Sequence, residues 1–313
     1  MATTFAERGL TQSKSSGGVK VGRPSFLWSL PAVTYFALFA IVPLGVVGWL
    51  SLTSWSGVGS PHWVGTANWK AMFSDPVFTQ SFRITAILVL LGVVTQTPIS
   101  LLLGVWAAGH QRNRAVLSAC YFVPLLMSAA AIAIVWESLL NPYFGLPREM
   151  HWLFGSFVFN HGFLFSSPAT AFGVLTFVGM WQWTPFHTLI YQGGARAIPE
   201  VLYQAAAIDG AGRVNQFFHI TLPQLRNTMI TSIVLMVVGG LTTFDTILIL
   251  TQGQPGTATT STSYYMYVQG FQSFAFGNAS VIAVVLAAFA TVIALILVRA
   301  SGWDKMRSTQ EGV

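Results

Sequence analysis

The chain has 313 residues, of which 53% are hydrophobic and only 8% charged, whereas soluble domains carry about 25% charged residues. This composition excludes an ordinary soluble domain and predicts an all-α integral membrane protein. The net charge of +6 would suggest a nucleic-acid partner in a soluble protein, but here membrane topology accounts for the basic residues, so we predict no nucleic-acid binding.

Six apolar runs in the chain are long enough to cross a bilayer, which requires about 20 residues. We expect transmembrane helices at about 26–50, 84–108, 115–136, 168–191, 228–250 and 278–298. They form one transmembrane domain over 25–300. A flexible polar tail precedes it at 1–24, and a second tail follows at 301–313.

The lysines and arginines indicate the orientation of these helices, because they accumulate on the cytoplasmic side of a membrane. With the N-terminus inside, the cytoplasmic segments hold Arg8, Lys14, Lys20, Arg23, Arg112, Arg114, Arg196, Arg213, Arg226, Arg299, Lys305 and Arg307. The outer segments hold only Lys70, Arg83 and Arg148. Both termini and the polar stretch 198–226 are therefore expected in the cytoplasm.

The stretch 198–226 is the longest polar interval between two strongly apolar runs. Pro199 suits the first turn of a helix, and Gly210 and Gly212 interrupt the helical spacing where a turn is needed. A second short helix follows, with Pro223 near its end. The stretch is thus predicted to be a helix, a glycine turn and a second helix with an apolar face.

This stretch also carries a specific resemblance. The segments Gln204-Ala205-Ala206, Asp209-Gly210-Ala211 and Ile220-Thr221-Leu222-Pro223 resemble, with matching spacings, the EAA loop of ABC-importer permeases. The family usually has Glu where this chain has Gln204, which can donate and accept hydrogen bonds but cannot form an ion pair. The alternative is a passive amphipathic hairpin between two transmembrane helices.

The outer loops resemble the same family. Residues 64–69 and 73–78 are similar to the first outer loop of sugar-importer permeases, and 136–145 to the end of their third transmembrane helix. Residues 244–255 resemble the stretch F-D…L-T-x-G-G-P, which points to the carbohydrate-uptake branch of the maltose- and glycerol-phosphate-permease type. The Thr/Ser-rich segment 257–263 is interpreted as a flexible connector.

The resemblance implies a type I ABC-importer permease fold with six transmembrane helices in the bacterial cytoplasmic (inner) membrane. It implies four kinds of partner: two ATPase subunits, a second similar permease, an extracytoplasmic sugar-binding protein and the lipid bilayer. It further implies a coupling loop at about 196–226, in which the ATPase-coupling residues are Gln204, Ala205, Ala206, Asp209, Gly210, Ala211, Phe217, Leu222 and Pro223.

The sequence argues against an enzyme that acts alone. It contains no phosphate loop, no pair of carboxylates on one span and no histidines or cysteines at the spacing of metal ligands. We expect no metal site and no cofactor in this chain; ATP and magnesium would be bound by the partner ATPase subunits.

The candidate substrate path consists of Gln182, Trp183, Phe186, Thr243, Asp245 and Glu137. Sugars bind to aromatic faces and to side chains that form hydrogen bonds with hydroxyls, and charged residues in spans usually mark function. The alternatives are aromatic packing between helices and, for Asp245 and Glu137, a structural role. Alternative functions are import of a non-sugar solute such as a glycerol phosphodiester, or ion-coupled secondary transport.

Overall fold

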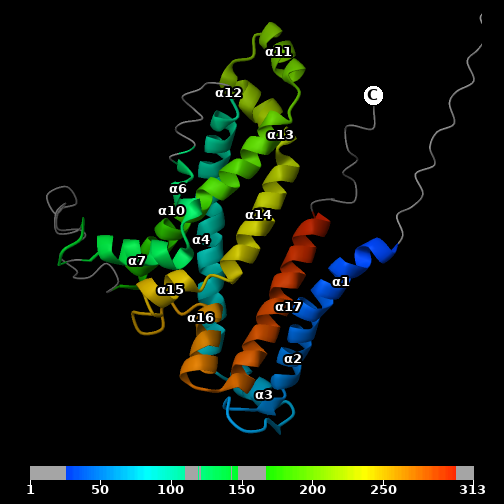
Figure 1. Cartoon of the computed structure of the whole chain (residues 1–313). Coiled ribbons are helices and arrows are strands. Elements are labelled where there is room, and N and C mark those ends of the chain that lie inside the picture. Colours follow the sequence, from blue (N-terminus) through cyan, green and yellow to red (C-terminus); the bar gives the residue numbers. More distant parts are fainter. Residues whose placement is uncertain (1–25, 110–118, 120, 142, 147–166, 301–313) are drawn as a thin grey trace, which may run out of the picture. The chain divides into compact units, whose positions relative to one another are not determined.

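The computed structural model describes residues 26–109, 119, 121–141, 143–146 and 167–300 (Figure 1). The predicted tails 1–24 and 301–313 lie outside these residues. The chain divides after Gly45 into two compact units.

The N-terminal helical run is almost continuous. It consists of a 3₁₀ turn Phe26–Ser29, α1 (Leu30–Phe36), a π turn Ala37–Ile41 and α2 (Val42–Leu50). Its large apolar side chains are exposed, among them Trp28 and Phe39, as expected for a surface that faces lipid. The run Leu27–Leu50 is long and apolar enough to cross a membrane, in agreement with the first predicted helix.

The described part of the second unit contains four long helices that run between its two ends (Figure 1). These are α4 (Pro76–Ala107), α10 (Pro168–Arg196), α14 (Arg226–Leu241) and α17 (Phe276–Ala300). One end carries α11 (Glu200–Ile208), α12 (Arg213–Gln216), a π turn Phe217–Thr221 and α13 (Leu222–Gln224). The other end carries α3 (Ala67–Phe73), α16 (Thr262–Tyr267) and a π turn Val268–Gln272. The shorter helices are α6 (Val123–Leu126), α7 (Ala129–Leu139) and α15 (Asp245–Leu250).

Glycines allow the long helices to approach closely. A Cβ atom on Gly104 of α4 would lie 2.6 Å from the Tyr191 Cβ of α10. A Cβ atom on Gly240 of α14 would lie 2.8 Å from the Val89 Cγ2 of α4. Small residues at helix crossings are typical of membrane bundles, where backbone packing replaces the hydrophobic effect.

A two-stranded hairpin organises the loop between α2 and α3. Strands β1 (Thr53–Ser54) and β2 (His62–Trp63) pair antiparallel, with Thr53 opposite Trp63. The Asn68 side chain, from the motif at 64–69, donates hydrogen bonds to the backbone oxygens of Ser51 (3.0 Å) and Thr53 (2.8 Å). The motif therefore fixes the chain as it leaves the first helical run.

Two more predicted transmembrane helices agree with the structure. The predicted helix 84–108 coincides with α4 up to Ala107. Helix α4 begins earlier than predicted because Asp75 caps it by accepting a hydrogen bond from the Val77 N–H (2.9 Å). The predicted helix 278–298 lies within α17. Both helices are long and apolar enough to cross a membrane. The predicted helix at 168–191 is part of α10, a continuous helix of 29 residues.

The transmembrane helix predicted at 115–136 is interrupted in the part that the structure describes. The chain breaks between α6 and α7 at Met127 and Ser128, whose backbone is extended. Ser128 Oγ accepts a hydrogen bond from the Ala131 N–H (3.2 Å) and so begins a new helix. Residues 115–118 and Cys120 lie outside the described residues.

The transmembrane helix predicted at 228–250 is likewise interrupted. Helix α14 ends at Leu241, and α15 begins at Asp245. The hydroxyls of Thr242 and Thr243 turn back to the carbonyl of Gly239 (3.0 and 3.5 Å), which stabilises the interruption. Among the described helices, three can cross a membrane by length and composition, or four if the bent pair that ends in α14 counts as one.

Candidate functional site

The first site is the polar end of the second unit, where α11 and α12 meet. Gly210 has a positive φ of 77°, a conformation that costs glycine little. The Ala211 N–H donates to the Ala206 carbonyl (2.8 Å) and the Gly210 N–H to the Ala207 carbonyl (3.1 Å). These two bonds form a Schellman motif, which ends α11 and turns the chain. The predicted glycine turn is therefore present.

Side-chain contacts hold the second arm of this stretch, residues 213–224, against the first arm, α11. The Tyr203 and Thr221 hydroxyls lie 2.9 Å apart, and the Gln216 amide donates to the Ala211 carbonyl (2.9 Å). Beyond this arm the chain bends by 66° at Leu225 and continues as α14. The arm is thus joined directly to a long helix of the bundle.

The predicted coupling residues divide into two groups. Gln204, Ala205, Asp209, Gly210 and Pro223 are exposed; Ala206, Ala211, Phe217 and Leu222 are partly buried. Phe217 and Leu222 pack inward against a core cluster formed by Leu101, Tyr191 and Leu225. They therefore anchor the stretch to α4 and α10.

Large apolar side chains are exposed on this stretch. Val201 and Ile208 of α11, Val214 of α12 and Phe218 are exposed, with Ile208 at 87% and Val214 at 73%. Because the stretch also carries charged and polar residues, this surface suits contact with protein better than contact with lipid tails.

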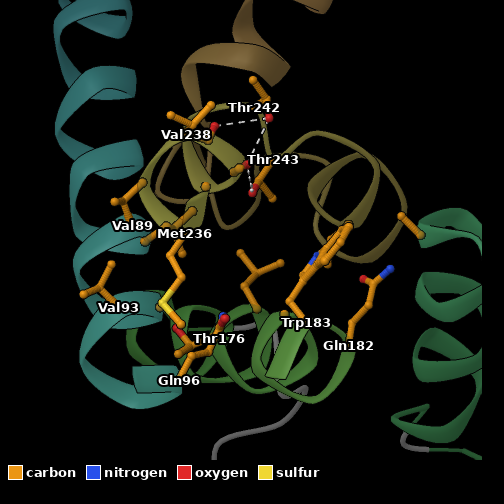
Figure 2. A pocket seen from close by; sticks show the side chains of 18 of the residues that line it. Val89, Val93, Gln96, Thr176, Gln182, Trp183, Met236, Val238, Thr242 and Thr243 are labelled. Carbon is orange, nitrogen blue, oxygen red and sulfur yellow. Dashed lines mark hydrogen bonds between the residues drawn. The ribbon is translucent and has the colours of Figure 1, made fainter. Parts of the chain in front are cut away.

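The second site is a cavity of about 550 Å³ between α4, α10, α14 and the break before α15. Five predicted substrate-path residues lie on its wall, namely Gln182, Trp183, Phe186, Thr243 and Asp245. Glu137 does not line the cavity; it is exposed on α7. Figure 2 shows Trp183 and Gln182 extending from α10, with Thr242 and Thr243 at the break above them.

The cavity combines an aromatic surface with polar groups. Trp183 is 47% exposed, so much of its indole is free of protein contact. Gln182 is 3% exposed, and among the described residues its Oε1 has no hydrogen-bond partner. An unpartnered buried oxygen is unfavourable, so it favours a bound hydroxyl or water in this cavity.

Some lining residues were not predicted. Gln96 of α4 and His187 of α10 both line the cavity, and His187 Nδ1 lies 2.9 Å from Ser232 Oγ of α14. Each of these polar residues interrupts a mainly apolar run of the sequence, and this interruption was the signal that could have identified them as lining residues. The glycines Gly92, Gly179, Gly239 and Gly240 also line the cavity. A Cβ atom on Gly179 or Gly239 would meet no atom within 4 Å, so these two glycines leave open space.

The segment 257–263 supports the cavity wall, so its interpretation as a flexible connector was wrong. Residues 259–263 are all buried. The Ser263 hydroxyl donates to the Leu241 carbonyl (2.9 Å), and the Ser261 hydroxyl to the Thr243 carbonyl (3.2 Å). The segment therefore satisfies carbonyl groups at the α14–α15 break. Thr262 binds α4 as well, because its N–H donates to the Thr85 hydroxyl (2.9 Å).

A second polar contact joins α16 to the start of α4. The Tyr265 hydroxyl donates a hydrogen bond to Asp75, and the Gln269 amide donates to the Tyr265 hydroxyl (2.6 Å). Burial, together with the bond to Asp75, raises the pKa of Tyr265 to about 12. The phenol is therefore protonated at neutral pH and remains a donor to the residue that caps α4.

Comparisons with known proteins agree on one family. Residues 100–302 match the family described as binding-protein-dependent transport system inner membrane component. The chain is 31% identical over 265 residues to the probable ABC transporter permease protein YurN of Bacillus subtilis, covering 83% of this chain and 90% of that protein. It is 31% identical over 239 residues to the trehalose/maltose transport system permease protein MalF of Thermococcus litoralis, covering 76% and 80%.

Solved structures share the fold. A chain of a bacterial alginate ABC transporter, crystallised in complex with an alginate pentasaccharide-bound periplasmic protein, superposes with a TM-score of 0.77. The match has 21% sequence identity and covers 91% of this chain and 96% of that chain. The family predicted from the pattern at 204–223 is thereby confirmed: the chain belongs to the inner membrane components of binding-protein-dependent transport systems, the ABC-importer permeases.

Proposed function

We propose that this permease carries a sugar or small oligosaccharide, by alternating access, in an ATP-driven importer. The observation that supports this proposal most directly is the meeting of Trp183, Gln182, Thr243 and Asp245 at one cavity. An exposed indole face can stack on a sugar ring, and the polar side chains can form hydrogen bonds with hydroxyls. The name of the trehalose/maltose relative supports the same class of substrate.

In this proposal the transmembrane domain spans 25–300 and crosses the membrane six times, with both termini in the cytoplasm. The broken segments α6–α7 and α14–α15 then lie inside the protein, because non-helical backbone at membrane depth needs partners other than lipid. The contacts of Ser261 and Ser263 with the break supply such partners.

The importer would contain two ATPase subunits, a second and similar permease, and an extracytoplasmic sugar-binding protein. The ATPase would dock on the stretch 196–226, where Val201, Ile208 and Val214 offer apolar contact and Gln204 and Asp209 offer polar contact. A binding protein would meet the opposite end of the bundle, near α3 and α16.

Helix α14 is the proposed mechanical link between the two sites. It follows the second arm after the 66° bend, and its other end carries Gly239 and Gly240 on the cavity wall. Its 16 residues span about 24 Å at 1.5 Å per residue. Movement of the arm by the ATPases would therefore tilt the cavity wall and alternate access to the two sides.

Reconstitution tests this function. The complete importer in proteoliposomes should take up labelled saccharide when ATP and the binding protein are supplied on their respective sides. A transport-inactive ATPase variant provides the matched control. Failure of a broad saccharide panel in an importer that takes up another solute class would remove the sugar assignment.

A further inference from the structure

Acceptor groups line the cavity. Gln182 Oε1 is buried and has no hydrogen-bond partner among the described residues. The Thr242 and Thr243 hydroxyls use their protons on the Gly239 carbonyl, so each presents lone pairs to its surroundings. Asp245, the first residue of α15, carries a carboxylate that only accepts when ionised. These groups favour a ligand that presents hydrogen-bond donors, and the Trp183 indole N–H and the Gln96 amide on the same wall can donate to acceptors of that ligand.

Asp245 supplies the one carboxylate among the described residues that line the cavity. The sequence stretches that supply the wall, 88–96, 175–187 and 235–247, contain no lysine or arginine. The one basic side chain on the described wall is His187, whose Nδ1 lies 2.9 Å from Ser232 Oγ. An anionic ligand would therefore lose water without gaining a lysine or arginine of this chain as its partner, and it would lie near a carboxylate.

We propose that the cavity accepts uncharged and amino-bearing saccharides and rejects acidic ones, with Asp245 as the residue that discriminates; this inference rests on the proposed saccharide transport. Neutral sugars present many hydroxyl donors to Gln182, Thr242 and Thr243. An ammonium group on a sugar gains a charged hydrogen bond with Asp245, whereas a carboxylate or sulfonate group is repelled by it. Selection by charge then occurs in the membrane path, in addition to any selection by the binding protein.

Direct binding tests this proposal without the binding protein. The purified complex of both permeases and the ATPases, in nanodiscs, is examined by saturation-transfer difference NMR. The probes are trehalose, fully deacetylated chitobiose and a disaccharide of two uronates. We expect trehalose and deacetylated chitobiose to bind and the diuronate to give no signal at the same concentration.

Variants assign the selectivity to one residue. Asp245→Asn should weaken binding of deacetylated chitobiose on the order of tenfold more than that of trehalose, because a hydrogen bond to a charged group is lost. Glu137→Gln removes the same charge from an exposed position outside the cavity wall and should leave the binding of trehalose and deacetylated chitobiose, and the absence of a diuronate signal, unchanged.

The outcomes separate this inference from the function on which it rests. Diuronate binding as tight as that of trehalose would overturn the charge selection while leaving saccharide transport intact. Equal effects of Asp245→Asn on amino and neutral probes would remove Asp245 as the discriminating residue. Absence of binding by all three probes, together with absence of saccharide uptake in proteoliposomes, would remove the proposed function itself.

Discussion

Two glycines in the turn between α11 and α12 are superficially alike but have different backbone requirements. Gly210 has φ of 77°, whereas Gly212 has φ of −68°. A Cβ atom would meet no atom within 4 Å at either position. Steric space therefore does not distinguish them, and backbone conformation does.

This difference makes a matched pair of substitutions. Gly210→Val should strain the turn, misalign α11 and α12, and lower both ATPase co-purification and saccharide-stimulated ATP hydrolysis, while membrane insertion remains normal. Gly212→Val adds the same side chain at an allowed φ and should retain both activities. Full stimulated hydrolysis and uptake in Gly210→Val would show that the stretch is a passive hairpin.

Gln204 is exposed on α11 and is the one residue of the coupling pattern that departs from the usual Glu. Gln204→Ala should have a small effect on ATPase co-purification, because at most a neutral hydrogen bond of about 1 kcal/mol is lost. Gln204→Glu should co-purify at least as much ATPase as the unchanged chain. A large loss in Gln204→Glu would indicate an acidic or apolar surface on the ATPase at this point.

Trp183 supplies the aromatic surface of the cavity. Trp183→Ala should lower the apparent affinity for transported sugar by about 1–3 kcal/mol through the loss of a large apolar contact. Trp183→Phe keeps an aromatic face and should retain part of the affinity. The measurement is the concentration dependence of uptake, with permease content determined by immunoblotting; unchanged uptake in a Trp183→Ala, Phe186→Ala double variant would contradict the site.

Among the elements, the segment 257–263 has a well-defined structural role, because it forms hydrogen bonds with both the α14–α15 break and α4. Ser263→Ala leaves the Leu241 carbonyl without its hydroxyl partner and should cost about 1–3 kcal/mol if water does not replace it. Ser263→Thr retains the hydroxyl and serves as the control. Thermal aggregation of the purified permease, measured with and without saccharide, should reveal lower stability in the Ala variant alone.

Helices were predicted well from the sequence where the length of an apolar run was enough to identify them. Helices α4 and α17 were predicted because each contains one long apolar run. The breaks within 115–136 and 228–250 were missed because residues on both sides remain apolar. Hydroxyls of Ser128 and Thr242 satisfy the backbone there, and such local bonds leave little trace in hydrophobic periodicity.

The residues predicted for the cavity lie on α10 and at the α14–α15 break, whereas the wall formed by α4 was not predicted. Trp183 and Gln182 stand out in an apolar run as an aromatic and an amide beside each other. The facing wall on α4 includes Val89, Gly92 and Val93, which are ordinary residues in a transmembrane helix. Their role follows from the close approach of α4 and α14 at Gly240, a tertiary contact that the sequence pattern does not encode.

On the scale of the whole molecule, the two proposed sites require opposite ends of the bundle to face different compartments. Stretch 198–226 carries Arg213 and Arg226, and with the other segments predicted to be cytoplasmic it accounts for most of the basic residues. The β1–β2 hairpin at the other end then faces outward. This orientation agrees with ATPase docking at α11 and α12.

Reporter fusions test this orientation. Green fluorescent protein fused after Val313 should fluoresce, whereas alkaline phosphatase at the same place should be inactive. The reverse pattern is expected for insertions after the exposed Gly59, between β1 and β2. An active phosphatase after Val313 would contradict the orientation and, with it, the docking of ATPases at the stretch 196–226.

The hydrogen bonds of Ser261 and Ser263 have a consequence for how such a permease diversifies. Both hydroxyls bind main-chain oxygens, at Thr243 and Leu241, so these two contacts do not depend on which side chains residues 241 and 243 carry. The Thr242 and Thr243 hydroxyls, by contrast, bind the Gly239 carbonyl and so belong to the frame as well as to the cavity. A library randomised at 245 alone should therefore retain a higher proportion of folded, membrane-inserted proteins than one randomised at 242 and 243.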